Sequence, residues 1–301
     1  ATTTYPLPQS GDVRQMRFFN SIRGRLILFT LVLAWLPLLA LAIVTYVAMQ
    51  NTMRTTIEDG LDGTGSSKVI DVDHWLDGLH DHAAVIAGIP SIAGDGDRVT
   101  AIGLDVIIRF EDNPESVAYQ QAYNAALQTL EQTVAHEPAI QSAMLFDVDG
   151  DVIVTTDDIV MQGTNASDYP TIPFEEGVVR PFTSDVVLSV DGGTPILVFL
   201  YPIDALNGER IGVLMFRVLI DAIREIMEDT SGLGTTGETY LVGYNPNDGV
   251  WQMVSESRFS PTGTTTILQQ EVDTFGVQQA LGGAPTGIGN YKDYRGIDVL
   301  G

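Results

Sequence analysis

Residues 26–49 form a run of 24 residues without a charged side chain, in which Leu, Ile, Val and Ala dominate. An α-helix rises about 1.5 Å per residue, so roughly 20 apolar residues cross the hydrocarbon core of a bilayer. We therefore expect a transmembrane helix here, kinked at Pro37. The alternative is a cleaved secretory signal, since Ala40-Leu41-Ala42 has the small-x-small form of a cleavage site. However, the run exceeds the roughly 7 to 15 apolar residues of a signal peptide.

The basic residues before this run set its expected orientation. Arg14, Arg17, Arg23 and Arg25 lie just before residue 26, and the cytoplasmic flank of a membrane helix carries such an excess. We therefore expect residues 1–25 in the cytoplasm, the helix in the cytoplasmic (inner) membrane, and the rest of the chain outside.

The chain beyond residue 50 is strongly acidic. It holds 11 basic and 38 acidic residues, a formal charge of −27. Such a surface repels nucleic acid and anionic lipid, so neither is an expected partner. It suits a secreted surface, a saline habitat or cation binding, and these three interpretations stay open. The chain has no cysteine, which excludes disulfides and thiolate metal sites, and nothing in it predicts a cofactor.

Two helices are expected after the span. Residues 66–89 carry apolar side chains at steps of three and four, which predicts an amphipathic stalk helix. Gly60, Gly63 and Gly65 leave room for a break before it. A second helix is predicted over 114–136, with a loop between the two helices.

From residue 142 onward the pattern changes to strands and tight turns. Residues 142–156 predict a hairpin with Asp149-Gly150 at its turn, and residues 194–203 and 210–220 predict two strands around Asn207-Gly208. The irregular stretch between them, residues 157–184, is a long excursion within a sheet and therefore a natural pocket.

The remaining residues repeat this layout in smaller form. A short helix at 221–228 precedes a hairpin from 238–244 and 250–257, a helical patch at 271–281 and a final strand pair at 289–301. The chain is expected to stop inside that last hairpin. The predicted fold class is α+β: a transmembrane helix, a long stalk helix and two PAS-like antiparallel-sheet modules.

Several segments resemble the double Cache (dCACHE) family, the extracellular sensor of many bacterial transmembrane receptors. They are GTTGETYLVGYNPNDG (234–249), YKDYRGIDVLG (291–301), WLDGLHDHAAVIAGIPSI (75–92), LFDVDGDVIVTTDD (145–158) and FLYPIDALNGERIGVLMF (199–216). The resemblance covers residues 50–301. It implies two modules on a long helix, the distal one binding a small ligand, with a second membrane span after the last strand. The implied domains are a cytoplasmic segment (1–25), the span (26–49), stalk and long helices (50–140), a membrane-distal module with the pocket (141–229) and a truncated membrane-proximal module (230–301).

The sequence departs from the family at the residue that determines the ligand. Amino-acid-binding members carry an Asp on the strand after Gly-Val-Leu, and Arg217 stands at this position. Its guanidinium suits a carboxylate or phosphate, which makes an anion the expected ligand. In so acidic a chain, the alternative is that Arg217 pairs with a nearby acidic residue. The residues placed in or beside the pocket by the resemblance are Tyr169, Phe174, Arg180, Phe182, Ser184, Tyr201 and Arg217.

Three motifs have simpler interpretations than the sites they suggest. The GxGxxG pattern of residues 232–237 follows a helix and precedes a strand, the reverse of the order in a dinucleotide fold, so a connector is expected. The Asp-rich stretch 147–151 resembles a calcium loop but has Asp158 where such a loop has Glu, which favours a hairpin turn. His74, His80 and His82 are not three or four residues apart, so a metal site on one helix is not expected.

We therefore predict an extracytoplasmic small-molecule sensor of a signal-transduction receptor of histidine kinase, chemoreceptor or cyclase type, dimeric through its long helix. The alternative is a structural subunit that uses a Cache-like domain as a contact surface. An extracellular hydrolase lacks support, because the chain has neither a GxSxG nor an HExxH motif. We expect no catalytic residue and no metal ligand in this chain.

Overall fold

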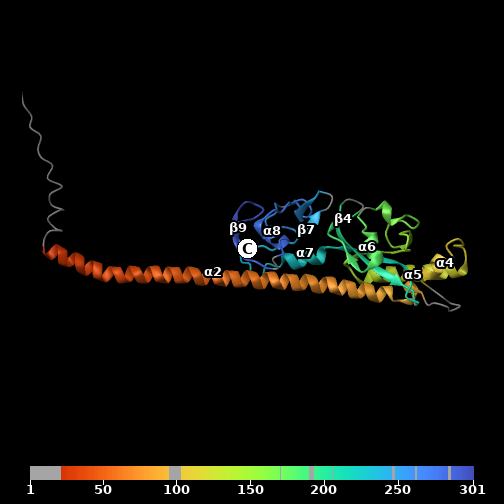
Figure 1. The fold of residues 1–301 in the computed structure, drawn as a ribbon, viewed down its shortest axis with the longest axis horizontal. Helices are drawn as coiled ribbons and strands as arrows, with labels where there is room; N and C mark the ends of the chain where they lie inside the picture. Colours follow the sequence, from red (N-terminus) through yellow and green to blue (C-terminus); the bar gives the residue numbers. More distant parts are fainter. Residues whose placement is uncertain are drawn as a thin grey trace, which may run out of the picture. The chain divides into compact units, whose positions relative to one another are not determined.

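The protein is described from a computed structural model, shown in Figure 1. The structure describes residues 22–94, 103–169, 171–189, 193–205, 207–245, 248–261, 263–283 and 286–301. Arg14 and Arg17 lie outside these ranges, as does most of the expected cytoplasmic segment. The chain divides into two compact units, Ala1–Asp59 and Gly60–Gly301.

Helix α2 (Ile22–Ala87) contains the apolar run. The most apolar 18-residue stretch of this helix has a mean hydropathy of 2.7 and is exposed throughout, so it is long and apolar enough to cross a membrane. The helix continues through Gly60, Gly63 and Gly65, so the break that these residues allowed does not occur. Each glycine costs about 1 kcal/mol relative to alanine, which a long helix with a packed C-terminal part absorbs.

The connection after α2 is more regular than the predicted loop. It contains α3 (Pro90–Ala93) and α4 (Leu104–Arg109), and α4 buries Leu104, Val106 and Ile107. Six residues are too few for helical periodicity to show, which is why the sequence did not predict α4. Helix α5 (Val117–His136) follows, with the hydroxyl of Ser116 accepting a hydrogen bond from the Tyr119 amide at 3.2 Å.

The central element is an antiparallel sheet. Its strands are β1 (Ile140–Phe146), β2 (Val152–Thr155), β3 (Phe182–Thr183), β4 (Val187–Leu188), β5 (Pro195–Asp204) and β6 (Arg210–Leu219). Their order is β2-β1-β6-β5-β3, and β4 also pairs with β5. The predicted turns are confirmed: Gly150 and Gly208 have φ values of 89° and 81°, which glycine adopts at little cost.

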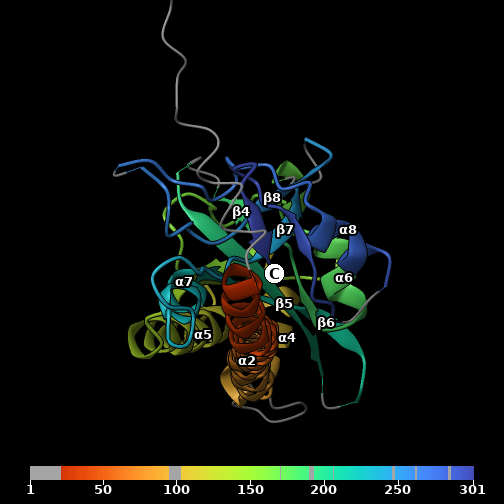
Figure 2. The ribbon, with the colours of Figure 1, turned by 90° about the vertical axis from the view of Figure 1, so that its left-hand side faces the viewer.

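Alternate side chains of a strand point to opposite sides of a sheet. Both faces of this sheet are buried, each in its own cluster. On the helix face, Leu145, Phe199 and Phe216 pack in one cluster with residues of α2 and α5 such as Ala83 and Leu130. Figure 2, which looks along α2, shows α5 beside it. We call the opposite side the cap face.

The cap face is covered by the connection from β2 to β5, which we call the cap segment (residues 156–194). This segment includes the 3₁₀ helix η1 (Ala166–Asp168), the short helix α6 (Phe174–Val179) and strands β3 and β4. Met144, Leu200 and Met215 lie in one row across β1, β5 and β6. They belong to a second buried cluster, which Ile172 and Phe174 of the cap segment join.

The C-terminal part contains α7 (Asp221–Glu228), β7 (Val242–Asn245), β8 (Val250–Met253), α8 (Phe275–Leu281), β9 (Asn290–Lys292) and β10 (Asp298–Leu300). β7 pairs with β8 and β9 pairs with β10, both antiparallel. The backbone of residues 268–272 lies along the other side of β8, since the Leu268 amide bonds to the Met253 carbonyl at 2.7 Å and the Val272 amide to the Trp251 carbonyl at 2.9 Å. The predicted α+β fold class is confirmed.

Helix α7 is joined to α2 by a buried lysine. Lys68 of α2 donates a hydrogen bond to the Ile226 carbonyl in the last turn of α7, and its ammonium lies 3.3 Å from the Asp229 carboxylate. Hydrogen bonds from Ser231, together with Lys68, lower the pKa of Asp229 to about 2. The C-terminal end of α7 is therefore held against α2 at Lys68.

Candidate functional site

Arg217 lies in the middle of the sheet with its side chain on the cap face. In the paired strands its neighbours are Ser142 of β1 and Val198 of β5. The side chain is only 3% exposed. Its two terminal nitrogens donate to a carboxylate oxygen of Asp157 and to the hydroxyl of Ser189. Within the part of the chain that the structure describes, its Nε finds no hydrogen-bond partner.

Asp157 is the acidic partner of this arginine, and its side chain is 5% exposed. Oδ2, the oxygen that faces Arg217, also accepts a hydrogen bond from the Ser142 hydroxyl at 2.7 Å. Oδ1 accepts from the amides of Ile159 at 2.8 Å and Val160 at 2.9 Å. Burial by itself would raise the pKa of Asp157, but these donors and Arg217 outweigh it and hold the pKa below its usual value. The expected alternative, a pair between Arg217 and an acidic residue, is the arrangement in the structure.

Three of the predicted aromatic residues line the cap side of the sheet. Tyr169, Phe174 and Phe182 all pack against the cap-face cluster. The rings of Phe174 and Phe146 have centroids 5.5 Å apart, and the Tyr169 hydroxyl donates to Thr164 at 3.3 Å. These side chains form an apolar wall on the same face as Arg217.

Three other predicted residues take different positions. The Arg180 side chain is 65% exposed, and its guanidinium lies 3.8 Å from the Glu176 carboxylate and 5.8 Å from the centre of the Phe182 ring. The hydroxyl of Ser184 fastens the cap segment, accepting from the Val198 amide at 2.9 Å. Tyr201 packs against the helix-face cluster. The alternation of β5 therefore separates Tyr201 from the other predicted residues.

Asp157 also lines an open groove of about 460 Å³. The groove is bordered by α5 residues and by the end of β2, and its lining residues are Leu127, Glu131, Val134, Ala135, Thr155, Thr156, Asp157 and Asp158. None of the seven predicted site residues borders it.

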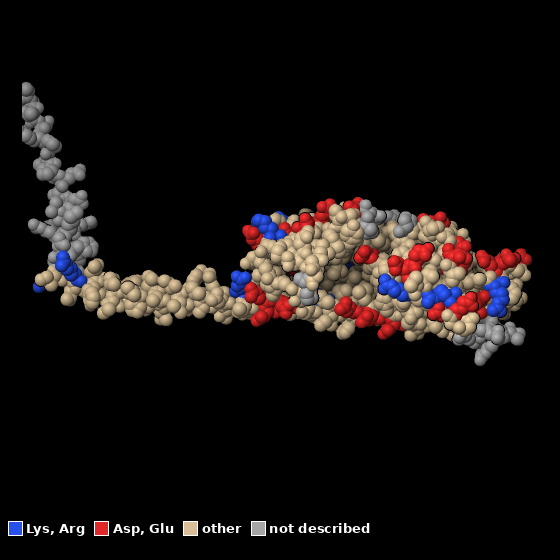
Figure 3. Space-filling view, viewed as in Figure 1, with Lys and Arg blue, Asp and Glu red and all other residues tan. Residues whose placement is uncertain are grey.

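Figure 3 shows many more acidic than basic side chains on the visible face of residues 60–301. The sequence predicts an acidic partner for Arg217 but does not single out Asp157, because Asp157 is one of many acidic residues in the chain.

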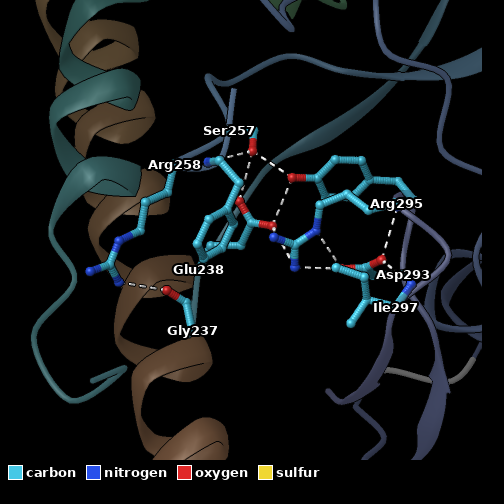
Figure 4. A network of polar contacts seen from close by, with 9 residues as sticks. Gly237, Glu238, Ser257, Arg258, Asp293, Arg295 and Ile297 are labelled. Carbon is cyan, nitrogen blue, oxygen red and sulfur yellow. Dashed lines mark hydrogen bonds and ion pairs between the residues drawn. The ribbon is translucent and has the colours of Figure 1, made fainter. Parts of the chain in front are cut away.

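A second polar centre lies in the C-terminal part and is drawn in Figure 4. The Glu238 carboxylate accepts hydrogen bonds from Ser257 and Tyr294, each at 2.9 Å. Arg295 lies 3.8 Å from Glu238 and donates from Nε to Asp293 at 2.7 Å. Burial, with a contribution from Glu238, raises the pKa of Tyr294 to about 12. These contacts fasten the β9–β10 hairpin to the segments before β7 and after β8.

A cavity of about 210 Å³ adjoins this centre, lined by Met227, Glu228, Thr230, Glu238, Thr239, Glu256, Ser257 and Arg258. The polar groups around it are largely engaged with the protein. Glu256 accepts hydrogen bonds from Thr265 and Thr266, and Arg258 donates to the carbonyls of Gly234 and Gly237 at 3.0 and 2.8 Å. The GxGxxG pattern thus forms a turn after α7 that Arg258 secures.

The two suggested metal motifs also have structural roles. The Asp147 carboxylate accepts from the amides of Asp149 and Asp151, as a hairpin turn requires. Burial raises the pKa of Asp147, and its two acidic neighbours add to this effect. His80 bonds to the Thr183 hydroxyl at 3.0 Å. Among the described residues, no group of three or more His, Asp or Glu side chains is arranged to hold a metal ion.

Comparison with known proteins finds no matching family model and no matching curated sequence. Solved structures do match. The ligand-binding domain of the Campylobacter jejuni chemoreceptor Tlp3 with L-norvaline has a TM-score of 0.53 at 11% identity, over 82% of this chain and 85% of that one. The same domain with 4-methylisoleucine has a TM-score of 0.52 at 11% identity, over 79% and 82%. The sensor domain of the Vibrio cholerae histidine kinase DctB has a TM-score of 0.43 at 15% identity, over 83% and 87%.

At these identities the likeness shows the fold. The chain has the fold of double Cache ligand-binding domains, as its sequence segments predicted. It combines this fold with a helix long and apolar enough to span a membrane.

Proposed function

We propose that this chain is the extracytoplasmic small-molecule sensor of a membrane-bound signalling receptor. The observation that carries the proposal is that one helix, α2, contains both the apolar span and the face on which the sheet of a ligand-binding fold packs. The neighbours of known structure are ligand-binding domains of a chemoreceptor that were solved with small ligands. In this proposal the chain binds its ligand without chemistry, and any catalytic activity belongs to other parts of the receptor.

The proposed topology follows from the basic flank of the span. Arg23 and Arg25 at the start of α2 favour a cytoplasmic N-terminus in the inner membrane, with residues 50–301 outside. The membrane-distal module (141–229) holds the ligand, the proximal module (230–301) follows it, and two copies associate through the stalk. Output of histidine kinase, chemoreceptor or cyclase type fits this arrangement.

The proposed ligand is a small carboxylate or another anion. Its binding surface combines Arg217 with the aromatic wall of Tyr169, Phe174 and Phe182. A buried guanidinium binds a planar anion through charge-assisted hydrogen bonds. Ligand binding transmits a signal only if two conformations of the receptor bind the ligand unequally.

A thermal-shift screen tests the sensor function. The full chain, in detergent, is heated with carboxylates, amino acids, purines, polyamines and divalent cations, since a ligand of the folded state raises the melting temperature. We expect saturable stabilisation by one class of small molecule. A folded protein that responds to no class contradicts the sensor function and favours the structural subunit.

A further inference from the structure

Arg217 holds both ends of the cap segment. Asp157 stands two residues after β2, where the segment begins, and Ser189 follows β4, near its end. Both contacts are made by one buried guanidinium from the middle of the sheet. Any group that replaced Asp157 on Arg217 would therefore remove one of the contacts that hold the beginning of the cap segment to the sheet, beside the hydrogen bonds from Ser142 to Asp157 and between Thr156 and Ala143.

The contact between Arg217 and Asp157 satisfies the arginine incompletely. Oδ1 of Asp157 is committed to the amides of Ile159 and Val160, so only Oδ2 faces the guanidinium. As a result Nε of Arg217 is buried without a hydrogen-bond partner among the described residues. A free carboxylate can bind an arginine through two parallel hydrogen bonds, which are stronger and more specific than one. It would satisfy a donor that Asp157 cannot reach.

The surroundings of Asp157 allow its carboxylate to leave Arg217, at a cost in free energy. Asp157 is one of the residues that line the groove of about 460 Å³, so open space adjoins this residue. Glu131 and Asp158 line the same groove, and their charge disfavours a third carboxylate there. The same charge therefore favours the pairing of Asp157 with Arg217. It raises the free energy that a ligand must supply to displace Asp157 from Arg217.

From this geometry we infer that Asp157 is a built-in competitor, which a ligand carboxylate must displace from Arg217. The inference rests on the proposed sensor function and names both the ligand group and its regulation. Binding exchanges the single-oxygen contact of Asp157 for a two-oxygen contact of the ligand. The exchange removes one contact between the sheet and the beginning of the cap segment, so occupancy of Arg217 and the position of this segment are coupled.

Calorimetric titration of the full chain in nanodiscs of uncharged lipid tests this inference, with acetate and succinate as probes. Asp157→Asn removes the competing charge and keeps Oδ1 as the acceptor for the two amides. We expect this variant to bind at least one probe about tenfold or more tightly than the unaltered chain, because the binding-competent state no longer has to be freed first. The double variant Asp157→Asn with Arg217→Met should bind neither probe.

Two further variants distinguish competition by Asp157 from a general effect of net charge. Glu175→Gln removes one negative charge from an exposed position of the same cap segment, and we expect its affinity to stay within about twofold of the unaltered chain. Ser142→Ala removes one of the donors that hold Asp157 and should give an increase of the same sign but smaller size. Ser142→Ala also provides the test if Asp157→Asn does not fold.

Equal gains in Asp157→Asn and Glu175→Gln would overturn the inference, since the effect would then come from net charge. So would a failure of both Asp157→Asn and Ser142→Ala, in folded protein, to bind either probe more tightly. If another class of molecule from the thermal-shift screen binds the unaltered chain and Asp157→Asn equally well, the sensor function stands and the competitor is refuted.

Discussion

The buried pair of Arg217 and Asp157 makes a sharp prediction about stability. The two side chains are 3% and 5% exposed, so removal of one partner leaves the other charge desolvated. Breaking a buried ion pair in this way costs about 3–5 kcal/mol. Asp157 keeps hydrogen bonds from Ser142, Ile159 and Val160, so we expect Arg217→Met to cost about 3 kcal/mol, at the lower end of that range.

The double variant tests whether the loss is electrostatic. With Asp157→Asn added to Arg217→Met, the site is neutral and Oδ1 still accepts the two amide hydrogen bonds. Because neutral replacements of a whole buried pair are often tolerated, we expect the double variant to lie within about 1.5 kcal/mol of the unaltered protein. The double variant should therefore lose much less stability than the sum of the losses of the two single variants.

Urea unfolding of the full chain in detergent measures these differences. The fluorescence of Trp75, which packs against the helix-face cluster, reports on the sheet. A single Arg217→Met variant that loses less than about 1 kcal/mol would refute the reasoning, because the charge on Asp157 would then not be desolvated. A double variant as unstable as the sum of the single ones would also refute it, since the loss would then come from packing.

Three other predictions concern stability. Gly212→Ala should destabilise the protein by about 1–3 kcal/mol in urea unfolding, because its Cβ would lie 2.1 Å from the Phe146 carbonyl oxygen. Gly78→Ala, with nothing within 4 Å, is the matched control and should stabilise α2 by up to about 1 kcal/mol. The pKa of Asp157 is lower in the folded state than in the unfolded state, so its stabilisation is complete above the unfolded value of about 3.9 and is lost as the pH falls through the folded value. The difference in unfolding free energy between the unaltered protein and Asp157→Asn should therefore shrink from about pH 5 to about pH 3, and a constant difference would contradict the assigned direction. Tyr294→Phe should cost about 1–2 kcal/mol by thermal unfolding, because its hydroxyl bonds to two partners within the protein, and no loss would show that water replaces those bonds.

The orientation of side chains explains why some residues assigned to the pocket lie on the face of Arg217 and Tyr201 does not. Tyr169, Phe174 and Phe182 were assigned to the pocket through the family resemblance, and the structure places them on the cap face with Arg217. Tyr201 was assigned in the same way, yet it lies on the helix face. A one-residue change along a strand moves a side chain to the opposite face, and a resemblance without an alignment does not fix the position to one residue.

The sequence by itself determined the elements whose signals are local. The apolar run predicted a helix long enough to cross a membrane, the Asp149-Gly150 and Asn207-Gly208 turns predicted two hairpins, and the short helix at 221–228 has the bounds of α7. Each of these depends on residues that are neighbours along the chain, where periodicity, turn propensity and hydropathy act directly.

Only the tertiary structure decided which acidic residue meets Arg217. Asp157 is 60 positions away in the sequence, and the pairing of β1 with β2 and β6 brings the two side chains together. The continuity of α2 through three glycines and the burial of α4 likewise depend on packing against distant residues. Such contacts are set by strand register and by the shape of the core, which no local pattern of residues encodes.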